Sequence, residues 1–311
     1  RPMNFCTRHQ PGHPLAIAAI IAALFTACGT PSRSSSIDPG ATVPATSGPT
    51  ASSAAAPSAP PAASPAQTAS PERSLEPTAG SSLPQGADEV NLDPAEFSAV
   101  IDHPYWPMAP GTRWTYRETG PDGEVLDVVI VATDQTKRIA NGVTARVVRD
   151  TVRQGDEIIE DTFDWYAQDR EGNLWYLGED TAEFEGGKIS STGGSFEAGV
   201  DGALPGIILP AEAVPGLRYR QEYYRGEAED NGEVLSLNEM VDVEKGHFAD
   251  AILTKDTSTI EPDVLEYKLY ARGVGPVLIL DISGGAGREE LVAVDQAPAG
   301  AGTGPLGSPN P

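Results

Sequence analysis

The sequence predicts an all-β fold, an antiparallel meander of about eleven strands that forms a curled sheet, a half-barrel or a barrel, with one short N-terminal helix. Beyond residue 110, apolar and polar residues alternate with a period of two, which is typical of strands. Turn sequences such as Asn141-Gly142 and Asp230-Asn231-Gly232 separate these runs. No amphipathic helical pattern of ten residues interrupts them, so the crossovers that a parallel sheet needs are missing.

The elements follow from local signals. Asp93 is a good N-cap and Pro94 suits the first position of a helix, which His103-Pro104 should end. The expected strands are 113–118, 125–133, 144–152, 158–168, 173–178, 218–224, 234–243, 248–255, 265–272, 276–282 and 289–294.

The most distinctive hairpin runs from Trp165 to Tyr176. A three-residue loop at 170–172, with Gly172 in a left-handed conformation, places Tyr166 opposite Tyr176 and Ala167 opposite Trp175. Both tryptophans then share one face of the hairpin, and we expect that face to be the core.

Composition divides the chain into a signal peptide (1–27), a tether (28–90), a folded domain (91–296) and a tail (297–311). Residues 41–71 contain only Ala, Pro, Ser, Thr, Gly, Val and Gln, which predicts a disordered segment. The tail repeats this composition, and we expect it to be disordered as well.

An export signal precedes the tether. Residues 15–25 are eleven uncharged apolar residues, too few to span a bilayer but typical of a signal peptide. The following Thr26-Ala27-Cys28 completes a sequence that resembles a bacterial lipobox, although Phe25 replaces the usual leucine. The resemblance implies that Cys28 carries thioether-linked lipid and palmitate. It predicts an exported protein, anchored to the outer face of the cytoplasmic membrane or to the outer membrane.

Charge and missing motifs limit the function. A net charge of −24 disfavours binding to nucleic acid or to anionic lipid headgroups and favours weak, nonspecific attraction for divalent cations. No H-E-x-x-H, C-x-x-C or P-loop sequence is present, so we assign no catalytic residue, metal ligand or cofactor. Two carboxylate clusters, at 160–164 and 227–233, leave a calcium site or a paired-carboxylate enzyme open.

The segment 193–216 breaks the alternating pattern. It contains six glycines and three prolines around an apolar centre, and long irregular connections are often functional. We expect it to plug or cover one end of the sheet, or to form a ligand mouth. The apolar residues for that role are Phe196, Leu204, Pro205, Ile207, Ile208 and Leu209.

Three stretches carry a family resemblance. Residues 164–179, with the pattern D-W-Y-A-Q-D-x-x-G-N-x-W-Y-x-G-E, and residues 197–211 and 221–230 resemble an uncharacterised family of exported bacterial proteins. The resemblance implies no activity. More distantly, a lipid-anchored curved meander is similar to the half-barrel lipoproteins that shuttle lipids.

Together these features predict a membrane-anchored bacterial lipoprotein that displays a non-catalytic β domain for binding or scaffolding in the cell envelope, with another envelope protein as one candidate partner. The first alternative is a carrier of a lipid or other hydrophobic ligand. The second is a calcium-dependent envelope enzyme.

Overall fold

The computed structural model describes residues 83–283 and 287–310. Within them the chain forms one 3-10 helix and sixteen strands, and every strand pairing is antiparallel. The strands are β1 (Phe97–Ser98), β2 (Thr112–Thr119), β3 (Val125–Arg138), β4 (Thr144–Gln154), β5 (Glu157–Asp169), β6 (Leu174–Glu185), β7 (Lys188–Ser191), β8 (Phe196–Glu197), β9 (Leu204–Leu209), β10 (Arg218–Arg220), β11 (Glu222–Tyr223), β12 (Asp230–Val243), β13 (Gly246–Ser258), β14 (Leu265–Ala271), β15 (Gly275–Asp281) and β16 (Gly287–Gln296).

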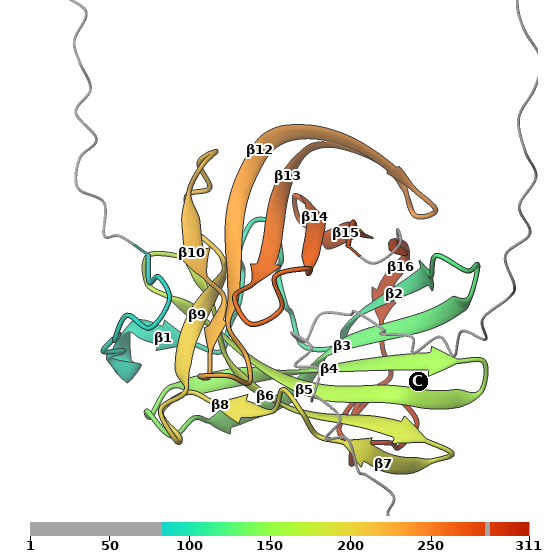
Figure 1. The fold of residues 1–311 in the computed structure, drawn as a ribbon, viewed down its shortest axis with the longest axis horizontal. Coiled ribbons are helices and arrows are strands. Elements are labelled where there is room, and N and C mark those ends of the chain that lie inside the picture. Colours follow the sequence, from blue (N-terminus) through green and yellow to red (C-terminus); the bar gives the residue numbers. More distant parts are fainter. Residues whose placement is uncertain (1–82, 284–286, 311) are drawn as a thin grey trace, which may run out of the picture. The chain divides into compact units, whose positions relative to one another are not determined.

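The sheet closes on itself through one short segment. Its hydrogen-bonded path runs from β10 through β12 to β16, then through β2 to β6, and ends at β9 and β11 (Figure 1). Only Gln221 separates β10 from β11 in the chain. Tyr219 of β10 pairs with Gly232, whereas Glu222 of β11 pairs with Pro205. The segment 218–223 therefore joins both ends of the path, and the sheet is barrel-like.

Two glycines permit this closure. A Cβ atom on Gly206 would collide with the main-chain carbonyl of Gln221, and one on Gly232 would collide with the ring of Tyr219. Both positions lack a side chain because backbone or an aromatic ring occupies that space.

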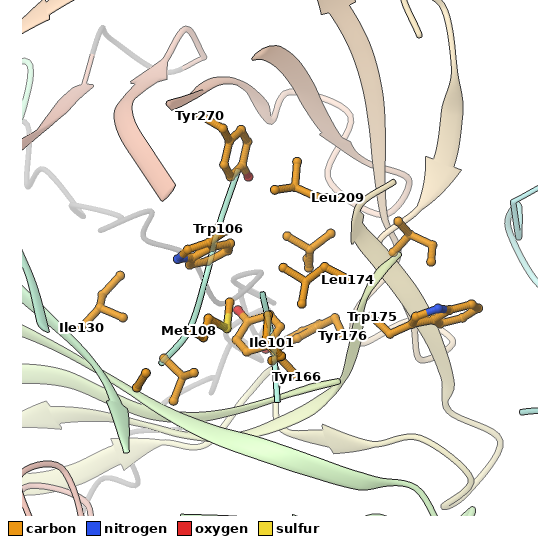
Figure 2. Packing of buried hydrophobic residues seen from close by; sticks show 14 of the residues in the cluster. Ile101, Trp106, Met108, Ile130, Tyr166, Leu174, Trp175, Tyr176, Leu209 and Tyr270 are labelled. Atoms are coloured by element: carbon orange, nitrogen blue, oxygen red, sulfur yellow. The ribbon is translucent and has the colours of Figure 1, made fainter. Parts of the chain in front are cut away.

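An aromatic cluster fills one part of the interior. The ring of Trp106 lies 5.6 Å from Tyr166 and 6.1 Å from Tyr270, and Tyr166 lies 5.1 Å from Tyr176 (Figure 2). These four side chains are all less than 3% exposed. Trp106 comes from the loop before β2, so this loop fixes β5, β6 and β14 around one centre.

The all-β prediction is confirmed, but the predicted count of about eleven strands is too low. All eleven expected strands are present, and 218–224 divides into β10 and β11 because the chain changes partner strand at Gln221. The missed strands β1, β7 and β8 have four residues or fewer, and β9 is buried at most positions, so it shows no alternation.

The expected short helix is a single 3-10 turn, Pro94–Glu96. Asp93 caps it as predicted, and its side chain accepts a hydrogen bond of 3.0 Å from the main-chain N–H of Ala95. The chain then enters β1, which pairs with β5, so tertiary pairing ends the helix after three residues.

The predicted hairpin register is confirmed. Tyr166 pairs with Tyr176 and Ala167 with Trp175, and Gly172 has a φ of 99°. The tryptophan face is buried as predicted, with Trp165 and Trp175 6% and 7% exposed, but the other face is buried as well, because the two tyrosines join Trp106 inside the sheet. Trp175 packs on Phe97, 5.8 Å between centroids, and the other tryptophan packs under the ammonium group of Lys137.

The predicted disordered tail is wrong, because residues 297–310 pack against the outer face of β4 and β5. There Arg149 and Asp161 form an ion pair with fully buried side chains. The N–H of Gly307 donates to Asp161, at 2.6 Å, and Arg149 donates to the carbonyl of Ser308, at 2.8 Å. An ion pair on this face needs a polar cover, and the main chain of the tail supplies it.

The folded domain begins before the predicted residue 91. Main-chain atoms of 83–88 contact buried Arg220, whose N–H donates to Pro84 and whose guanidinium donates to Gly86 and Asp88. The predicted signal peptide, most of the tether and Cys28 lie outside the described residues.

Within the two described ranges, no helix is both long enough and apolar enough to cross a membrane.

Candidate functional site

Ten carboxylates and one ammonium group face the inside of the closed sheet, and we call this set the acidic belt. Eight of the carboxylates are buried, while those of Glu160 and Asp230 are half-buried and mark where the belt reaches solvent. The belt consists of Glu118, Asp150, Glu160, Asp164, Glu179, Glu222, Asp230, Asp256, Glu266, Glu289 and Lys268.

The strand period places these residues. In β2, Trp114, Tyr116 and Glu118 are buried, while Arg117 and Thr119 between and after them are exposed. One face of the strand therefore runs from aromatic to acidic, because side chains alternate along a strand. Tyr270, Lys268 and Glu266 repeat this change along β14. The belt therefore lies beside the aromatic cluster.

Several carboxylates of the belt oppose each other directly across neighbouring strands. Directly opposed residues of an antiparallel pair have Cβ atoms roughly 4.5–5.5 Å apart, and like charges there destabilise the sheet. The opposed pairs are Glu118 with Glu289, Asp164 with Glu179, and Asp256 with Glu266.

The phenol of Tyr176 bridges one of these pairs. Its oxygen lies 2.8 Å from Oδ1 of Asp164 and 2.6 Å from Oε2 of Glu179. A hydroxyl has one proton to donate, so the second contact requires a protonated carboxyl that donates to the phenol oxygen. Burial raises the pKa of Asp164 to about 8 despite the Tyr176 hydrogen bond, and it also raises that of Glu179. At neutral pH the pair therefore holds a proton.

Lys268 forms ion pairs with two carboxylates of the belt. Its Nζ lies 2.9 Å from Oδ2 of Asp256 and 3.2 Å from Oε2 of Glu266. Gln221, the residue at the closure point, also donates to Oδ2 of Asp256, at 3.1 Å.

Other carboxylate oxygens of the belt are buried without a partner, in addition to Oδ1 of Asp256. Glu289 is 2% exposed, and neither of its carboxylate oxygens has a hydrogen-bond partner among the described residues. Oδ1 of Asp150 and Oε2 of Glu118 are also buried without one. Leaving a buried acceptor unsatisfied costs roughly 1–3 kcal/mol, and more when it is charged. These three carboxylates therefore stand out as a costly arrangement.

The same three groups resist ionisation. Burial raises the pKa of Glu118 to about 7, and the charges of nearby carboxylates, Glu266 first, add to the rise. Burial and then the charge of Glu118 hold the pKa of Glu289 well above its usual range. Burial has the same effect on Asp150. Strongly shifted groups collect at functional sites, although ion-pair networks also shift them.

The structure places some members of the two predicted carboxylate clusters in the belt. From the carboxylate cluster at 160–164, Glu160 and Asp164 face the belt, whereas Asp161 points outward to Arg149. From the cluster at 227–233, only Asp230 joins the belt.

The residues predicted for a lid or ligand mouth lie in strands. Phe196 starts β8 and packs on Tyr176 with centroids 5.7 Å apart, and β9 spans Leu204–Leu209. Phe196, Pro205, Ile207, Ile208 and Leu209 are buried, and Leu204 is half-buried. Their role at a ligand mouth stays a prediction.

His103 is a packed core residue, as its position before Pro104 suggested. Its Nδ1 accepts a hydrogen bond from the N–H of Tyr105, at 3.2 Å, so Nε2 carries the proton toward the carbonyl of Pro210. Burial lowers its pKa, which keeps the ring neutral.

In the part of the chain that the structure describes, no group of three or more His, Cys, Asp or Glu side chains is arranged to hold a metal ion. The carboxylates of the belt are spread around the wall of the sheet instead of converging on one point.

Most residues of the belt were not predicted from the sequence. Glu118 is the one acidic residue of β2, and Glu289 is one of two adjacent glutamates in β16, of which only Glu289 is buried. The burial of Glu118 could have been predicted from the alternation, because Glu118 lies on the same face of the strand as Trp114 and Tyr116.

The comparisons with known proteins leave the chain without a family. No protein-family model matches it, and no curated protein matches it. Two solved structures resemble it over about three fifths of its length. An exported protein from Bacteroides fragilis with a YmcC-like fold has 15% identity and a TM-score of 0.38, covering 62% of this chain and 99% of its own. A lipoprotein from Parabacteroides distasonis has 9% identity and a TM-score of 0.34, covering 61% and 98%. At these scores neither likeness carries an argument about this chain.

Proposed function

We propose that this chain is a lipid-anchored protein of the cell envelope whose β domain is a non-catalytic binding module, with the binding site inside the closed sheet. The observation that carries the binding role is Glu289, a buried carboxylate with two unpartnered oxygens that directly opposes Glu118. Two opposed, buried carboxylates without partners lower the stability of the fold. Unfavourable arrangements of this kind are expected at functional sites.

The anchoring part of the proposal rests on the sequence. The apolar run at 15–25 and the lipobox-like residues up to Cys28 support export and lipid attachment. The composition of the following tether supports a flexible connection that holds the domain away from its membrane. The uncharacterised exported family remains our proposed relationship for the domain.

The acidic wall favours a polar ligand over the lipid of the carrier hypothesis. A cavity for an acyl chain is lined mainly by apolar groups. Here the apolar residues of β9 pack into the core, and the wall of the sheet carries buried carboxylate oxygens without partners.

Native mass spectrometry of the full chain, extracted in detergent from its host membranes, tests the proposal. We expect a species heavier than the mature polypeptide by a diacylglyceryl group and an acyl chain, together with a bound small molecule that collision activation releases. Cys28→Ala should remove the lipid mass and leave the small molecule in place. A chain without lipid would contradict the anchoring, and a lipidated chain without any bound molecule would contradict the binding role.

A further inference from the structure

The charge balance inside the sheet points to a cation. Three other buried cationic side chains of the described domain do not contact the belt. Arg149 pairs with Asp161 on the outer face, and Arg146 and Arg220 donate to main-chain carbonyls. Lys268 is therefore the one buried Lys or Arg side chain of the described chain that contacts belt carboxylates, and it contacts Asp256 and Glu266.

Buried carboxylate oxygens without a partner occur on Asp256, Glu118, Asp150 and Glu289, and the last three residues form one group. Glu289 lies opposite Glu118 in the pairing of β16 with β2. The charges of Glu118 and Asp150 both act on Glu289, so these three carboxylates are neighbours in space. Each has at least one buried oxygen that no described residue contacts. Hydrogen-bond donors with positive charge would satisfy these atoms and remove the repulsion between the opposed carboxylates.

The distribution of the carboxylates indicates how far the cationic ligand must extend. They come from nine strands, and neighbouring strands lie roughly 4.8 Å apart. A single small ion cannot contact carboxylates that are spread over several strands. A flexible chain with two or more ammonium groups can, and its methylene spacers could pack on the neighbouring aromatic residues, such as Tyr116.

We infer that the acidic belt binds an aliphatic polyamine, with one ammonium group between the directly opposed Glu118 and Glu289 and a second held by carboxylates farther along the belt, such as Asp150. This inference rests on the proposed binding function and adds the class of ligand. The half-buried Glu160 and Asp230 are the points where such a ligand first meets the belt.

Isothermal titration of the full, detergent-solubilised chain with spermidine in 150 mM NaCl tests this. The chain offers a matched pair of variants. Glu289→Gln removes a charge from the belt, and Glu290→Gln removes the same charge from the next residue, which faces outward and pairs with Arg288. We expect Glu289→Gln to weaken spermidine binding at least tenfold, whereas Glu290→Gln should stay within twofold of the wild type. Butylamine, with one ammonium group, should bind at least tenfold more weakly than spermidine.

Three results would overturn the inference: no heat of binding at millimolar spermidine, equal affinities of the two variants, or equal affinities of spermidine and butylamine. Circular dichroism establishes whether each variant folds, and Asp150→Asn replaces Glu289→Gln if the latter does not. If spermidine does not bind while native mass spectrometry still finds a ligand of another class, the polyamine inference is wrong and the proposed function stands. If neither method finds a ligand, both are wrong.

Discussion

Glu289→Gln should change how the stability of the domain depends on pH. In the folded chain, burial and the charge of Glu118 raise the pKa of Glu289 well above its usual range, whereas in the unfolded chain it titrates normally. Above pH 4.5 the folded state therefore binds one proton more than the unfolded state. Its stability is highest below the unfolded pKa and falls as the pH rises toward the folded pKa. Glutamine cannot ionise, so the variant loses this dependence.

The expected change in the free energy of unfolding follows from a difference of one bound proton between the folded and unfolded states. A difference of one bound proton changes the free energy of unfolding by about 1.4 kcal/mol per pH unit. Between pH 5 and pH 8 this amounts to at most about 4 kcal/mol for one group. Residual structure in the unfolded chain reduces it, so we expect Glu289→Gln to be about 2–4 kcal/mol more stable than the wild type at pH 8. At pH 5 the two should be within about 1 kcal/mol.

Urea unfolding of the full chain at pH 5, 6, 7 and 8, without added polyamine, measures this directly. Glu290→Gln is the control, because it removes an outward-facing charge and should follow the wild type. Parallel pH dependences of the wild type and Glu289→Gln would refute the reasoning, since Glu289 would then be ionised in the folded chain. A Glu289→Gln variant that is less stable at pH 8 would also refute it.

Three further predictions concern buried polar groups on both faces of the sheet. Lys268→Met leaves the two carboxylates that it contacts without their cation, and we expect a loss of about 3–5 kcal/mol in urea unfolding at pH 8. The loss should be smaller at pH 5, because burial raises the pKa of Glu266 to about 7 and this partner is then protonated. Asp161→Asn leaves Arg149 buried and unpaired and should cost about 3–5 kcal/mol; it should also expose residues 297–310 to proteolysis, and an unchanged digestion pattern would contradict the role of the tail as a cover. Tyr176→Phe removes the hydroxyl between two carboxyl groups and should cost about 1–3 kcal/mol, with no loss if that hydroxyl makes no net contribution.

The sequence predicted the fold class because the alternation is regular in most strands. The hairpin register followed from loop length and from Gly172. Closure of the sheet did not follow from the sequence. It depends on a segment that changes partner strand at Gln221 and on two glycines that let the main chain of Gln221 and the ring of Tyr219 come close. Local composition shows neither event.

The errors at the termini have a common cause. Residues 297–310 resemble a linker, yet they fold because they cover an ion pair whose members, Arg149 and Asp161, lie far away in the sequence. Burial of the tyrosine face of the hairpin was missed because it also depends on residues far away in the sequence, such as Trp106. Most of the belt was missed because its members come from nine strands, which are brought into one sheet only by the fold.

Proton release on binding tests the central claim most directly. At pH 7 the belt holds protons on groups such as Asp164 and Glu289, and a bound polyamine favours their ionised forms. Titration of the full chain with spermidine at pH 7, in two buffers with different ionisation enthalpies, counts the protons released. We predict at least one proton per bound spermidine, and fewer for Glu289→Gln. Binding without any proton release would contradict the claim that the ligand site is the acidic interior of the sheet.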